Sequence, residues 1–313
     1  MAEHTTDVVI IGSGPAGYTS AIYAARAGLK PILISGYEQG GQLTTTNEVE
    51  NYPGFASVIQ GPWLMEQMLL QAQHVGTNIV NDYVNNIDTS SRPFVISCDS
   101  GDTYIAKAVI IATGAQAKWL NNKTEQEFRG YGVSGCATCD GFFFKNKVVG
   151  IIGGGNTATE DAMYLANHAS KVYLIHRKDT LRSEKILQDR LFANPKIERL
   201  FNYELDEVYG DTEPKKVRGV KLKSTAKQQN IDIALDGLFI AIGHKPATDF
   251  LKNTLKLDEE GYISVKTGET TTSVSGIFAA GDVCDKKYRQ AITAAGLGCM
   301  AALDALKYIE SNH

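Results

Sequence analysis

VVIIGSGPAG, residues 8–17, runs from an apolar stretch into a glycine-rich turn of the form G-x-G-x-x-G. A shift of 141 residues, which places Ile10 on Ile151, superimposes it on IIGGGNTA, residues 151–158. Each copy reads as a strand, a turn, a helix and a second strand, which is a βαβ unit that suits a nucleotide pyrophosphate. One copy alone also fits tight packing without a ligand, whereas two in register predict two dinucleotide-binding units. The proposed turn contacts are Gly12, Gly14, Pro15, Ala16 and Gly17 in the first unit and Gly153, Gly155, Asn156, Thr157 and Ala158 in the second.

The residues after the second strand of each unit distinguish the two nucleotides. An acid there accepts a hydrogen bond from a free ribose 2′-hydroxyl, whereas arginine accommodates a 2′-phosphate. The first unit has only Glu38 within reach of a ribose, which favours a nucleotide without a 2′-phosphate, and FAD is the candidate. The second unit is cationic at this point and predicts NADPH rather than NADH; the alternative is a solvated charged turn. The residues proposed for the 2′-phosphate end are His176, Arg177, Lys178 and Arg182.

Two further motifs support FAD. VIIATG, residues 109–114, is an apolar strand ending in a glycine turn, and GIFAAGD, residues 276–282, is an apolar strand ending in Gly-Asp. The acid of the second motif is placed to accept hydrogen bonds from the hydroxyls of a ribityl chain. RQA, residues 289–291, then opens a helix whose N-terminal amides would face a flavin ring that is negatively charged when reduced. The proposed contacts are Ala112, Thr113, Gly114, Gly281, Asp282, Arg289, Gln290 and Ala291.

The order of these motifs predicts the architecture. FAD motifs lie at both ends of the chain, with the NADPH unit between them. The predicted fold class is α/β, with two Rossmann-like dinucleotide-binding domains. The FAD domain is discontinuous, residues 1–115 and 246–313, and the NADPH domain, residues 116–245, is inserted into it. Because only two short segments join them, relative rotation of the domains is the default expectation.

GCATCDG, residues 135–141, lies between the two glycine turns. A Cys-x-x-Cys pair brings its sulfurs close enough to form a disulfide and lowers the pKa of one thiol toward neutrality. One dithiol between two nucleotide sites predicts an electron relay through Cys136 and Cys139. Thiol–disulfide exchange needs an attacking thiolate and a protonated leaving sulfur, and Asp140 is well placed to move that proton. The alternative is a plain Asp-Gly turn.

Composition limits the remaining classes of function. The chain has 313 residues and a net charge of −4, which fits about two domains and argues against nucleic acid as a main partner. The apolar stretch at residues 8–11 is too short for a signal peptide, and no stretch approaches the ~18 apolar residues of a membrane span. We therefore expect a cytoplasmic protein. Zinc needs about four ligands, so a single Cys-x-x-Cys predicts no metal site.

With these residues assembled, the chain closely resembles the low-molecular-weight thioredoxin reductases over nearly its whole length. The resemblance rests on both glycine turns, GGQL at 40–43, EVENYPG at 48–54, CATCDG at 136–141, His-Arg at 176–177, Gly-Asp at 281–282 and RQA at 289–291. The dithiol inside the NADPH domain is the most diagnostic part, because glutathione and lipoamide reductases carry theirs near the N-terminus. The resemblance adds Gly41, Gln42 and Asn51 to the proposed FAD contacts.

The resemblance implies a homodimer with one FAD per subunit, which reduces the disulfide of thioredoxin with NADPH. By position, Cys139 would lie against the flavin, Cys136 would attack the disulfide of the partner protein, and Asp140 would act as acid or base. The family is also understood to alternate between two domain orientations.

The chain departs from the family pattern at two positions. Lys178 stands where arginine is usual, so the bidentate contact of a guanidinium group is lost. Tyr131 stands where many relatives have a cation. If that cation helps to dock thioredoxin, recognition here rests on Tyr131 and Arg129.

Three other functions remain open. A related flavoprotein disulfide reductase would have another protein substrate, as does the flavin subunit of a peroxide-reducing system. A dithiol oxidase would pass electrons to oxygen and ignore NADPH, although the intact second glycine turn and its cations speak against it. A redox sensor, from a different class, would bind the nucleotides without turnover.

Overall fold

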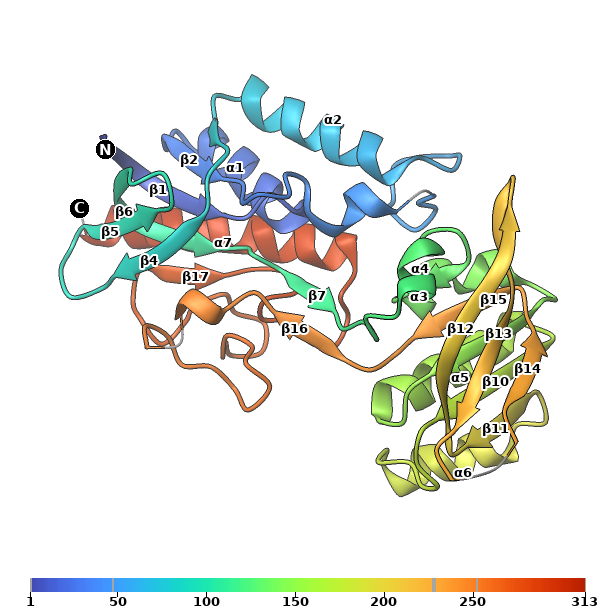
Figure 1. Cartoon of the computed structure of the whole chain (residues 1–313). Helices are drawn as coiled ribbons and strands as arrows, with labels where there is room; N and C mark the ends of the chain where they lie inside the picture. The colour runs from blue at the N-terminus through green and yellow to red at the C-terminus, as the bar shows by residue number, and fades with distance from the viewer. Residues whose placement is uncertain (1, 47, 227–228, 252, 313) are drawn as a thin grey trace. The chain divides into compact units, whose positions relative to one another are not determined.

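The computed structural model describes residues 2–46, 48–226, 229–251 and 253–312 of the chain (Figure 1). The chain divides into two compact units. Unit 1 comprises Met1–Gln116 and Lys245–His313, and unit 2 comprises Ala117–His244. The chain passes between them at β7 (Ala115–Ala117) and β16 (His244–Pro246), which pair as a two-stranded sheet. The second unit is therefore inserted into the first.

Unit 1 is built on a seven-stranded sheet with the order β3-β2-β1-β6-β5-β4 and with β17 paired to β6. Its central parallel strands, β1 and β6, end in apolar residues that are fully buried, as expected for strands covered on both faces. The parallel strands are β1 (Glu3–Ile11), β2 (Pro31–Ile34), β3 (Asn78–Val80), β6 (Thr103–Ile111) and β17 (Ile277–Ala279); β4 (Val84–Asp88) and β5 (Phe94–Cys98) continue the sheet in antiparallel pairing.

Alternate residues of β1 enter two different cores, because successive side chains of a strand point to opposite faces. Val8 and Ile10 pack with three helices, whereas Val9 and Ile11 pack with the β4–β5 side and with C-terminal loops. The three helices are α1 (Pro15–Arg26), α2 (Gly61–His74) and α7 (Ala291–Asn312). Two short 3₁₀ helices, η1 (Gly41–Thr45) and η3 (Asp249–Leu251), complete the unit.

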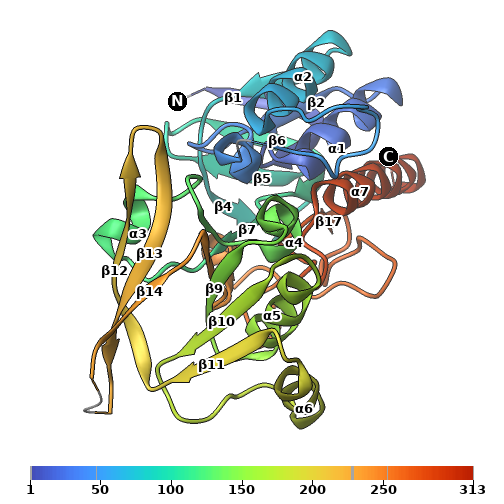
Figure 2. The ribbon, with the colours of Figure 1, turned by 90° about the vertical axis from the view of Figure 1, so that its right-hand side faces the viewer.

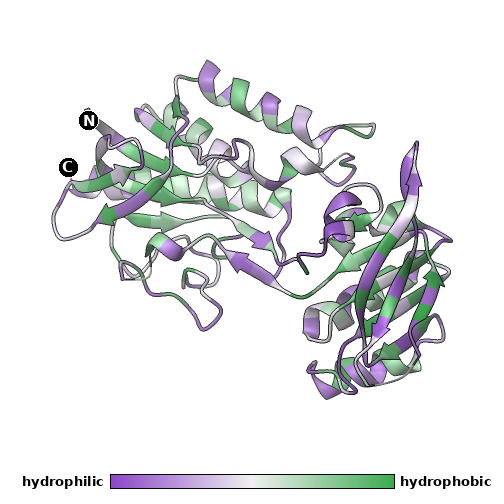
Figure 3. Ribbon diagram, viewed as in Figure 1, coloured by the Kyte–Doolittle hydropathy of each residue, from purple (hydrophilic) through white to green (hydrophobic). Residues whose placement is uncertain are grey.

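The helices of unit 1 differ in how apolar they are. The turns of α2 alternate between hydrophilic and hydrophobic colours in Figure 3, and only its inner side is buried. Among the described residues, α7 is the one helix long and apolar enough to cross a membrane, which differs from the sequence expectation. The apolar residues on one side of α7 pack in the core of unit 1, which explains their character. The buried residues are Ala294, Ala295, Gly298, Ala301, Ala302, Ala305 and Ile309.

Unit 2 is built on a parallel sheet with the order β11-β10-β9-β15-β8. Figure 2 shows α5 and α6 on one side of β9–β11 and an antiparallel sheet, β12–β14, on the other. The strands are β8 (Val133–Ser134), β9 (Val148–Ile152), β10 (Lys171–His176), β11 (Ile197–Phe201), β12 (Tyr203–Thr212), β13 (Lys215–Ser224), β14 (Ile231–Ala234) and β15 (Gly237–Ile240). The helices are α3 (Lys123–Glu127), α4 (Ala137–Asp140), η2 (Gly141–Phe144), α5 (Asn156–His168) and α6 (Lys185–Ala193).

The predicted fold class is confirmed. Each unit contains the strand, turn, helix and strand of a dinucleotide-binding βαβ unit: β1, α1 and β2 in unit 1, and β9, α5 and β10 in unit 2. The parallel pairing of the two strands places the start of the helix beside the glycine turn.

Candidate active site

Three turn glycines are explained by close packing of the backbone. A Cβ atom on Gly12 would lie 2.3 Å from the carbonyl oxygen of Ala112, and φ is +107° at this glycine. A Cβ atom on Gly17 would lie 1.9 Å from the carbonyl oxygen of Gly12. In unit 2, a Cβ atom on Gly153 would lie 2.4 Å from the carbonyl oxygen of Ala241. At these positions a larger residue would push strand and helix apart.

Gly14 and Gly155, which correspond in the repeat, have no such reason to be glycine. Their backbones are extended, with φ −71° and ψ −175° at Gly14 and φ −99° and ψ −174° at Gly155, a conformation open to any residue. Beyond their chain neighbours, no described atom lies within 4 Å of a Cβ atom built on either one. Each is the N-cap residue of the helix that follows. Open space at a helix N-terminus lets a phosphate reach the backbone amides, so both turns fit a pyrophosphate.

Distant segments of unit 1 surround the first turn. A Cβ atom on Gly41 would lie 3.4 Å from the Cα atom of Gly14, and one on Gly281 would lie 2.9 Å from the Cβ atom of Ala16. Pro15 is the first residue of α1, where its fixed φ suits a helix start. The GGQL and Gly-Asp motifs are therefore next to the turn, although the chain between them is more than two hundred residues long.

Side-chain hydrogen bonds hold four other predicted FAD residues, Asn51, Gln290, Gln42 and Thr113, in place. The Asn51 amide donates to the side-chain oxygen of Gln290 at 3.3 Å. The Gln42 amide donates to the carbonyl of Ala115. The Thr113 hydroxyl donates to the carbonyl of Ala247, which follows β16, at 2.8 Å. Glu38 is exposed and stands apart from this network. The remaining predicted residues lie at three places: Ala112 and Gly114 beyond the end of β6, Arg289 just before α7, and Ala291 as its first residue.

Asp282 lies in a largely apolar setting. Burial raises its pKa to about 7, Asp285 adds to the rise, and Arg289 opposes it. A carboxyl group with this pKa is protonated for a large share of molecules at neutral pH. Asp282 is thus able to donate as well as accept hydrogen bonds, which suits the hydroxyl groups of a polyol chain.

The predicted cations of unit 2 gather beside the second turn. Arg177, Lys178 and Arg182 are exposed, and within the described ranges none of them pairs with a carboxylate. The backbone amide of Arg182 donates to the carbonyl of Gly154 at 2.7 Å, which holds this segment against the turn. Three cations without acidic partners favour an anion at this place.

Asn156 and His176 have structural roles, which differ from the role proposed for the cations. The Asn156 side chain accepts from the amide of Glu184 at 2.9 Å, so it also fixes the cationic segment. His176 is buried, and a Cβ atom on Gly154 would overlap its imidazole ring at 2.2 Å. Burial lowers the pKa of His176, and the neighbouring cations lower it further. His176 therefore packs under the turn as a neutral ring and adds no charge. Thr157 and Ala158 follow within the first turn of α5.

The dithiol and the second glycine turn lie at the same edge of the sheet. β8 ends at Ser134, two residues before Cys136, and β9 ends at Ile152, one residue before Gly153. Both strands pair in parallel with β15, so their carboxyl ends face the same way. Ligands of open α/β sheets bind at this edge.

Cys136 and Cys139 form the predicted disulfide, with their Cα atoms 5.3 Å apart. Cys136 is the N-cap residue of α4, and its sulfur accepts from the backbone amide of Cys139 at 3.2 Å. Both cysteines are partly exposed. An amide directed at a sulfur stabilises it as a thiolate, which favours Cys136 as the nucleophile of the pair.

Asp140 follows directly and is partly buried. Burial raises the pKa of its carboxyl group, and a hydrogen bond with Ser134 opposes the rise. A carboxyl group with a raised pKa is better matched to proton transfer near neutral pH than an ordinary aspartate. Sequence reasoning did not identify Ser134, which carries no motif signal of its own.

Arg129 has contacts within unit 2 that the sequence did not predict. Its guanidinium group forms an ion pair at 2.5 Å with Glu125, a fully buried carboxylate, and stacks on the ring of Trp119 at 4.0 Å. These contacts give Arg129 a structural role, and its part in docking stays a prediction. Tyr131 remains half exposed, with the Lys215 ammonium group 5.3 Å from its ring centroid.

Phe142 is an exposed aromatic residue near the dithiol that the sequence analysis did not single out. It lies on η2, three residues after Cys139, and its side chain is 54% exposed. Its ring makes edge contacts with Phe143 and His168 on one side only. The run of three phenylalanines after the motif was the available signal.

Comparisons with known proteins agree with this geometry. A family model described as pyridine nucleotide-disulphide oxidoreductase matches residues 6–298. The chain is 58% identical over 305 residues to a thioredoxin reductase of Rickettsia felis, which covers 97% of this chain and 98% of that one. It is 53% identical over 311 residues to a thioredoxin reductase of Escherichia coli O157:H7, with 97% and 96% covered. The solved structure of a thioredoxin reductase from Giardia duodenalis superimposes with a TM-score of 0.94 at 42% identity, covering 98% of this chain and 99% of that one.

Proposed function

Because the chain belongs to the pyridine nucleotide-disulphide oxidoreductases and, among them, to the low-molecular-weight thioredoxin reductases, we propose that it reduces the disulfide of thioredoxin with NADPH through FAD and its own Cys136–Cys139 pair. The observation that carries this proposal is the disulfide at the carboxyl edge of the parallel sheet that also bears the second glycine turn. A peroxide-reducing relative is not favoured, because the similar chains are thioredoxin reductases at 51–58% identity over 97% of the sequence.

Unit 1 has the residues to hold FAD and unit 2 those to hold NADPH. In unit 1 the open space over Gly14 would take the pyrophosphate, and Asp282 would bind the polyol chain. In unit 2 the open space over Gly155 would take the pyrophosphate. The cations Arg177, Lys178 and Arg182 would bind the 2′-phosphate. When bound, FAD supplies the two-electron carrier between the nicotinamide and the disulfide. Among the described residues, no feature favours the other disulfide reductase, the dithiol oxidase or the redox sensor over a thioredoxin reductase.

The dithiol residues have separate roles. Cys139 receives the electron pair, and Cys136, whose sulfur accepts an amide hydrogen bond, attacks the disulfide of thioredoxin. Cys139 then displaces reduced thioredoxin from the mixed disulfide, which restores the Cys136–Cys139 bond. Asp140 supplies and recovers one proton at the sulfur that leaves. In each cycle NADPH gives up a hydride and the solvent gives up one proton, which together supply the two electrons and two protons of reduced thioredoxin. Asp140 relays a proton and ends the cycle as it began.

The proposed activity is tested by following NADPH oxidation with and without oxidised thioredoxin. We expect rapid oxidation only with thioredoxin present, and a far slower reaction with NADH because it has no 2′-phosphate for the cations. Equal rates without thioredoxin would point to the oxidase, and no oxidation of either nucleotide would point to the sensor.

Phe142 is proposed as part of the surface that thioredoxin contacts, because exposed aromatic residues beside a reactive pair supply contact area at low entropic cost. In the Phe142→Ala variant the KM for thioredoxin should rise about tenfold, as for loss of a contact of about 1.4 kcal/mol. The rate of NADPH oxidation with a small artificial disulfide should stay unchanged. A normal KM for thioredoxin would remove Phe142 from the docking surface.

We also propose that the chain forms a homodimer through the outer side of α7. Ile292, Gly296, Met300 and Leu303 are exposed, and their spacing of three to four residues puts them on one face of the helix. Outside α7 itself, no described atom lies within 4 Å of a Cβ atom built on Gly296, so a second helix can approach closely there. Exposed apolar patches of this kind mark interfaces between proteins.

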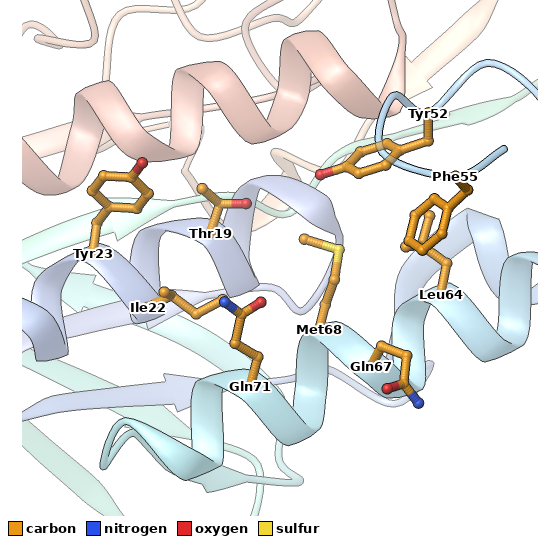
Figure 4. A pocket seen from close by; sticks show the side chains of 9 residues that line it. All are labelled: Thr19, Ile22, Tyr23, Tyr52, Phe55, Leu64, Gln67, Met68 and Gln71. Carbon is orange, nitrogen blue, oxygen red and sulfur yellow. The ribbon is translucent and has the colours of Figure 1, made fainter.

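The pocket shown in Figure 4 adjoins this patch. It has a volume of about 230 Å³ and lies between α1, α2 and the loop at residues 52–55. Tyr23 of α1 lines the pocket (Figure 4), and Cys299 of α7 raises the pKa of its hydroxyl group. The lining of the pocket is largely apolar, with Ile22, Leu64 and Met68 among its residues. The pocket thus extends the apolar surface of α7, and apolar side chains of a second subunit would fill it.

The dimer is tested with Leu303→Glu, which places a charge on a side chain that is 50% exposed at present. The wild type should have the mass of two chains in solution by light scattering, and the variant should dissociate at micromolar concentration. Leu70→Glu on α2, where the leucine is equally exposed, is the matched control for added charge. The interface would lie elsewhere if both variants remained dimeric.

A further inference from the structure

Arg289, two residues before α7 begins, has a strained backbone. Its φ angle is +49°, in the left-handed region that residues with a side chain usually avoid. Every other described non-glycine residue with a positive φ is an asparagine, a residue type that tolerates this region: Asn121, Asn146 and Asn202. A strained residue persists only where its surroundings fix it, and such residues cluster at functional sites. The contacts that fix Arg289 therefore bear on the proposed FAD site, to which it belongs.

The residues around this arginine, 285–290, lead into α7, and we call them the entry segment. The carboxylate of Asp285 accepts from the backbone amide of Lys287 at 2.9 Å and from that of Tyr288 at 3.0 Å. The carbonyl of Tyr288 accepts from the side-chain amide of Gln290 at 3.3 Å. These bonds lie within the entry segment, so they shape it without attaching it to the rest of unit 1.

Lys286 attaches the entry segment to a turn at residues 258–262, the hairpin turn. Its ammonium group donates to the carboxylate of Asp258 at 2.9 Å and to that of Glu260 at 2.5 Å. The other carboxylate oxygen of Asp258 accepts from the backbone amides of Glu260 at 2.9 Å and Tyr262 at 3.0 Å. Glu260 and then Asp258 raise the pKa of Lys286, which therefore stays charged at neutral pH. One ammonium group thus joins two carboxylates of a turn that is itself hydrogen-bonded.

The hairpin turn is a firm support, because the chain that follows it enters the core of unit 1. The backbone amide of Ile263 donates to the carbonyl of Val283 at 3.0 Å, and both side chains are buried in the core formed with β4 and β5. An isolated ion pair at the surface contributes little, because its side chains must be held in one geometry. Here backbone amides already hold one carboxylate and a second one shares the ammonium group, so the three charges form a network.

The entry segment ends on residues of the proposed FAD site. The side-chain oxygen of Gln290 accepts from the amide of Asn51 at 3.3 Å. The backbone carbonyl of Gln290 accepts from the hydroxyl of Thr293, in the first turn of α7, at 2.9 Å. Lys286 is therefore linked, through the few residues of the entry segment, to the start of α7 and to Asn51.

We propose that Lys286 is a positioning residue for the bound flavin. Its bonds to the hairpin turn hold Arg289 in the left-handed conformation, and this conformation sets the direction in which Gln290 and α7 begin. The inference rests on the proposed function, from which it takes FAD in unit 1, and extends it to a lysine outside the proposed FAD contacts. Lys286 acts through the entry segment and does not itself contact the flavin.

Without these ion pairs, Arg289 is released from a conformation that its side chain disfavours. The chain then turns at this residue, and the backbone amides at the start of α7 shift relative to the flavin. These amides carry the partial positive charge of the helix, which stabilises a reduced flavin because its ring is negatively charged. Two effects follow: FAD is held less firmly, and its reduced form is stabilised less.

The test uses the holoenzyme with Lys286→Met, which keeps the length of the side chain but removes its charge, and with Lys286→Arg, which keeps the charge. Release of FAD is followed by the fluorescence of the free flavin. The midpoint potential of the bound flavin is measured by a redox titration followed in its absorption spectrum. The thermal midpoint of each variant reports whether it is folded.

Two further lysines of unit 1 are matched controls. Lys107→Met removes a partly exposed ion pair of similar length, 2.8 Å, to Asp7. Lys287→Met removes a positive charge from the entry segment itself, where the ammonium group lies 5.0 Å from the ring centroid of Tyr288. The first controls for loss of an ion pair, and the second for loss of a charge near the flavin.

We expect Lys286→Met to release FAD about fivefold faster than the wild type, the factor that corresponds to a surface ion pair at the upper end of its range. The midpoint potential should shift to a more negative value, because the reduced flavin loses stabilisation. Lys286→Arg should restore both values, and both control variants should behave as the wild type. In the Lys286→Met background, Glu260→Gln should change neither value further, since the two groups act as a pair.

The proposal would be overturned if Lys286→Met lowered the thermal midpoint but left FAD release and the potential in place, since Lys286 would then stabilise the fold only. Equal changes in Lys287→Met would overturn it as well, because they would follow from charge and not from position. Neither reading needs thioredoxin. A wild type that holds FAD but fails to reduce thioredoxin would defeat the proposed function, and the same two readings would still decide the role of Lys286. A wild type that binds no FAD would overturn both.

Discussion

Replacing Cys139 by serine is expected to lower the rate of thioredoxin reduction at least about 1000-fold, as for removal of a reacting group in other enzymes. The reason is that the two electrons must pass through the Cys136–Cys139 pair, and the free cysteines, Cys98, Cys284 and Cys299, all lie in the other unit. Burial raises the thiol pKa of Cys98 and of Cys284 to about 12, so both are inert at neutral pH. Reduction of an artificial one-electron acceptor by NADPH should persist, because it does not need the disulfide.

Cys136→Ser should lower the rate of thioredoxin reduction as strongly as Cys139→Ser. Cys98→Ser should leave this rate unchanged. The two redox variants differ in one further respect. Only the variant that retains Cys136 should form a stable mixed disulfide with a thioredoxin that lacks its resolving cysteine. A trapped complex on Cys139 in the Cys136→Ser enzyme would reverse the roles of the two sulfurs. Full turnover by either variant would exclude the relay.

Replacing Gly155 by valine is expected to raise the KM for NADPH about 100-fold while leaving the fold intact. The side chain would stand in open space, since nothing lies within 4 Å of a Cβ atom there and the backbone is extended. The valine side chain would then block the approach of the pyrophosphate to the backbone amides of α5. Loss of these hydrogen bonds, at about 3 kcal/mol, corresponds to roughly a 100-fold rise of the KM for NADPH. Steady-state kinetics and thermal unfolding measure the two effects separately.

Gly153→Ala is the matched control, two residues away in the same turn. Here a Cβ atom would lie 2.4 Å from the carbonyl oxygen of Ala241, so the expected result is lower stability. The contrast separates a glycine needed by the fold from one needed by the ligand. An unchanged KM for NADPH in Gly155→Val would mean that the second turn does not bind the nucleotide.

The fold was predictable because its determinants are local in the sequence. Apolar strands, glycine turns and the shift between Ile10 and Ile151 specify two βαβ units. Their parallel pairing follows from the handedness of such units. The repeat also predicted where the ligands would bind, since Gly14 and Gly155 occupy the same place in each copy.

The details that were not predictable depend on contacts between distant residues. Arg129 appeared free in the sequence, but the structure pairs it with Glu125, whose burial no pattern announces. His176 appeared to belong with the cations next to it, but its ring packs under Gly154. The raised pKa of Asp140 depends on burial and on one hydroxyl group. Such environments arise only after the chain has folded, so single-sequence patterns do not contain them.

The most direct test of the electron relay is an anaerobic titration of the purified holoenzyme with NADPH, followed in the flavin spectrum and completed by adding oxidised thioredoxin. The relay predicts uptake of about two equivalents of NADPH per chain, one for the flavin and one for the disulfide, each a two-electron couple. Oxidised thioredoxin should then restore the flavin spectrum. Uptake of a single equivalent, with a flavin that thioredoxin cannot reoxidise, would contradict the relay.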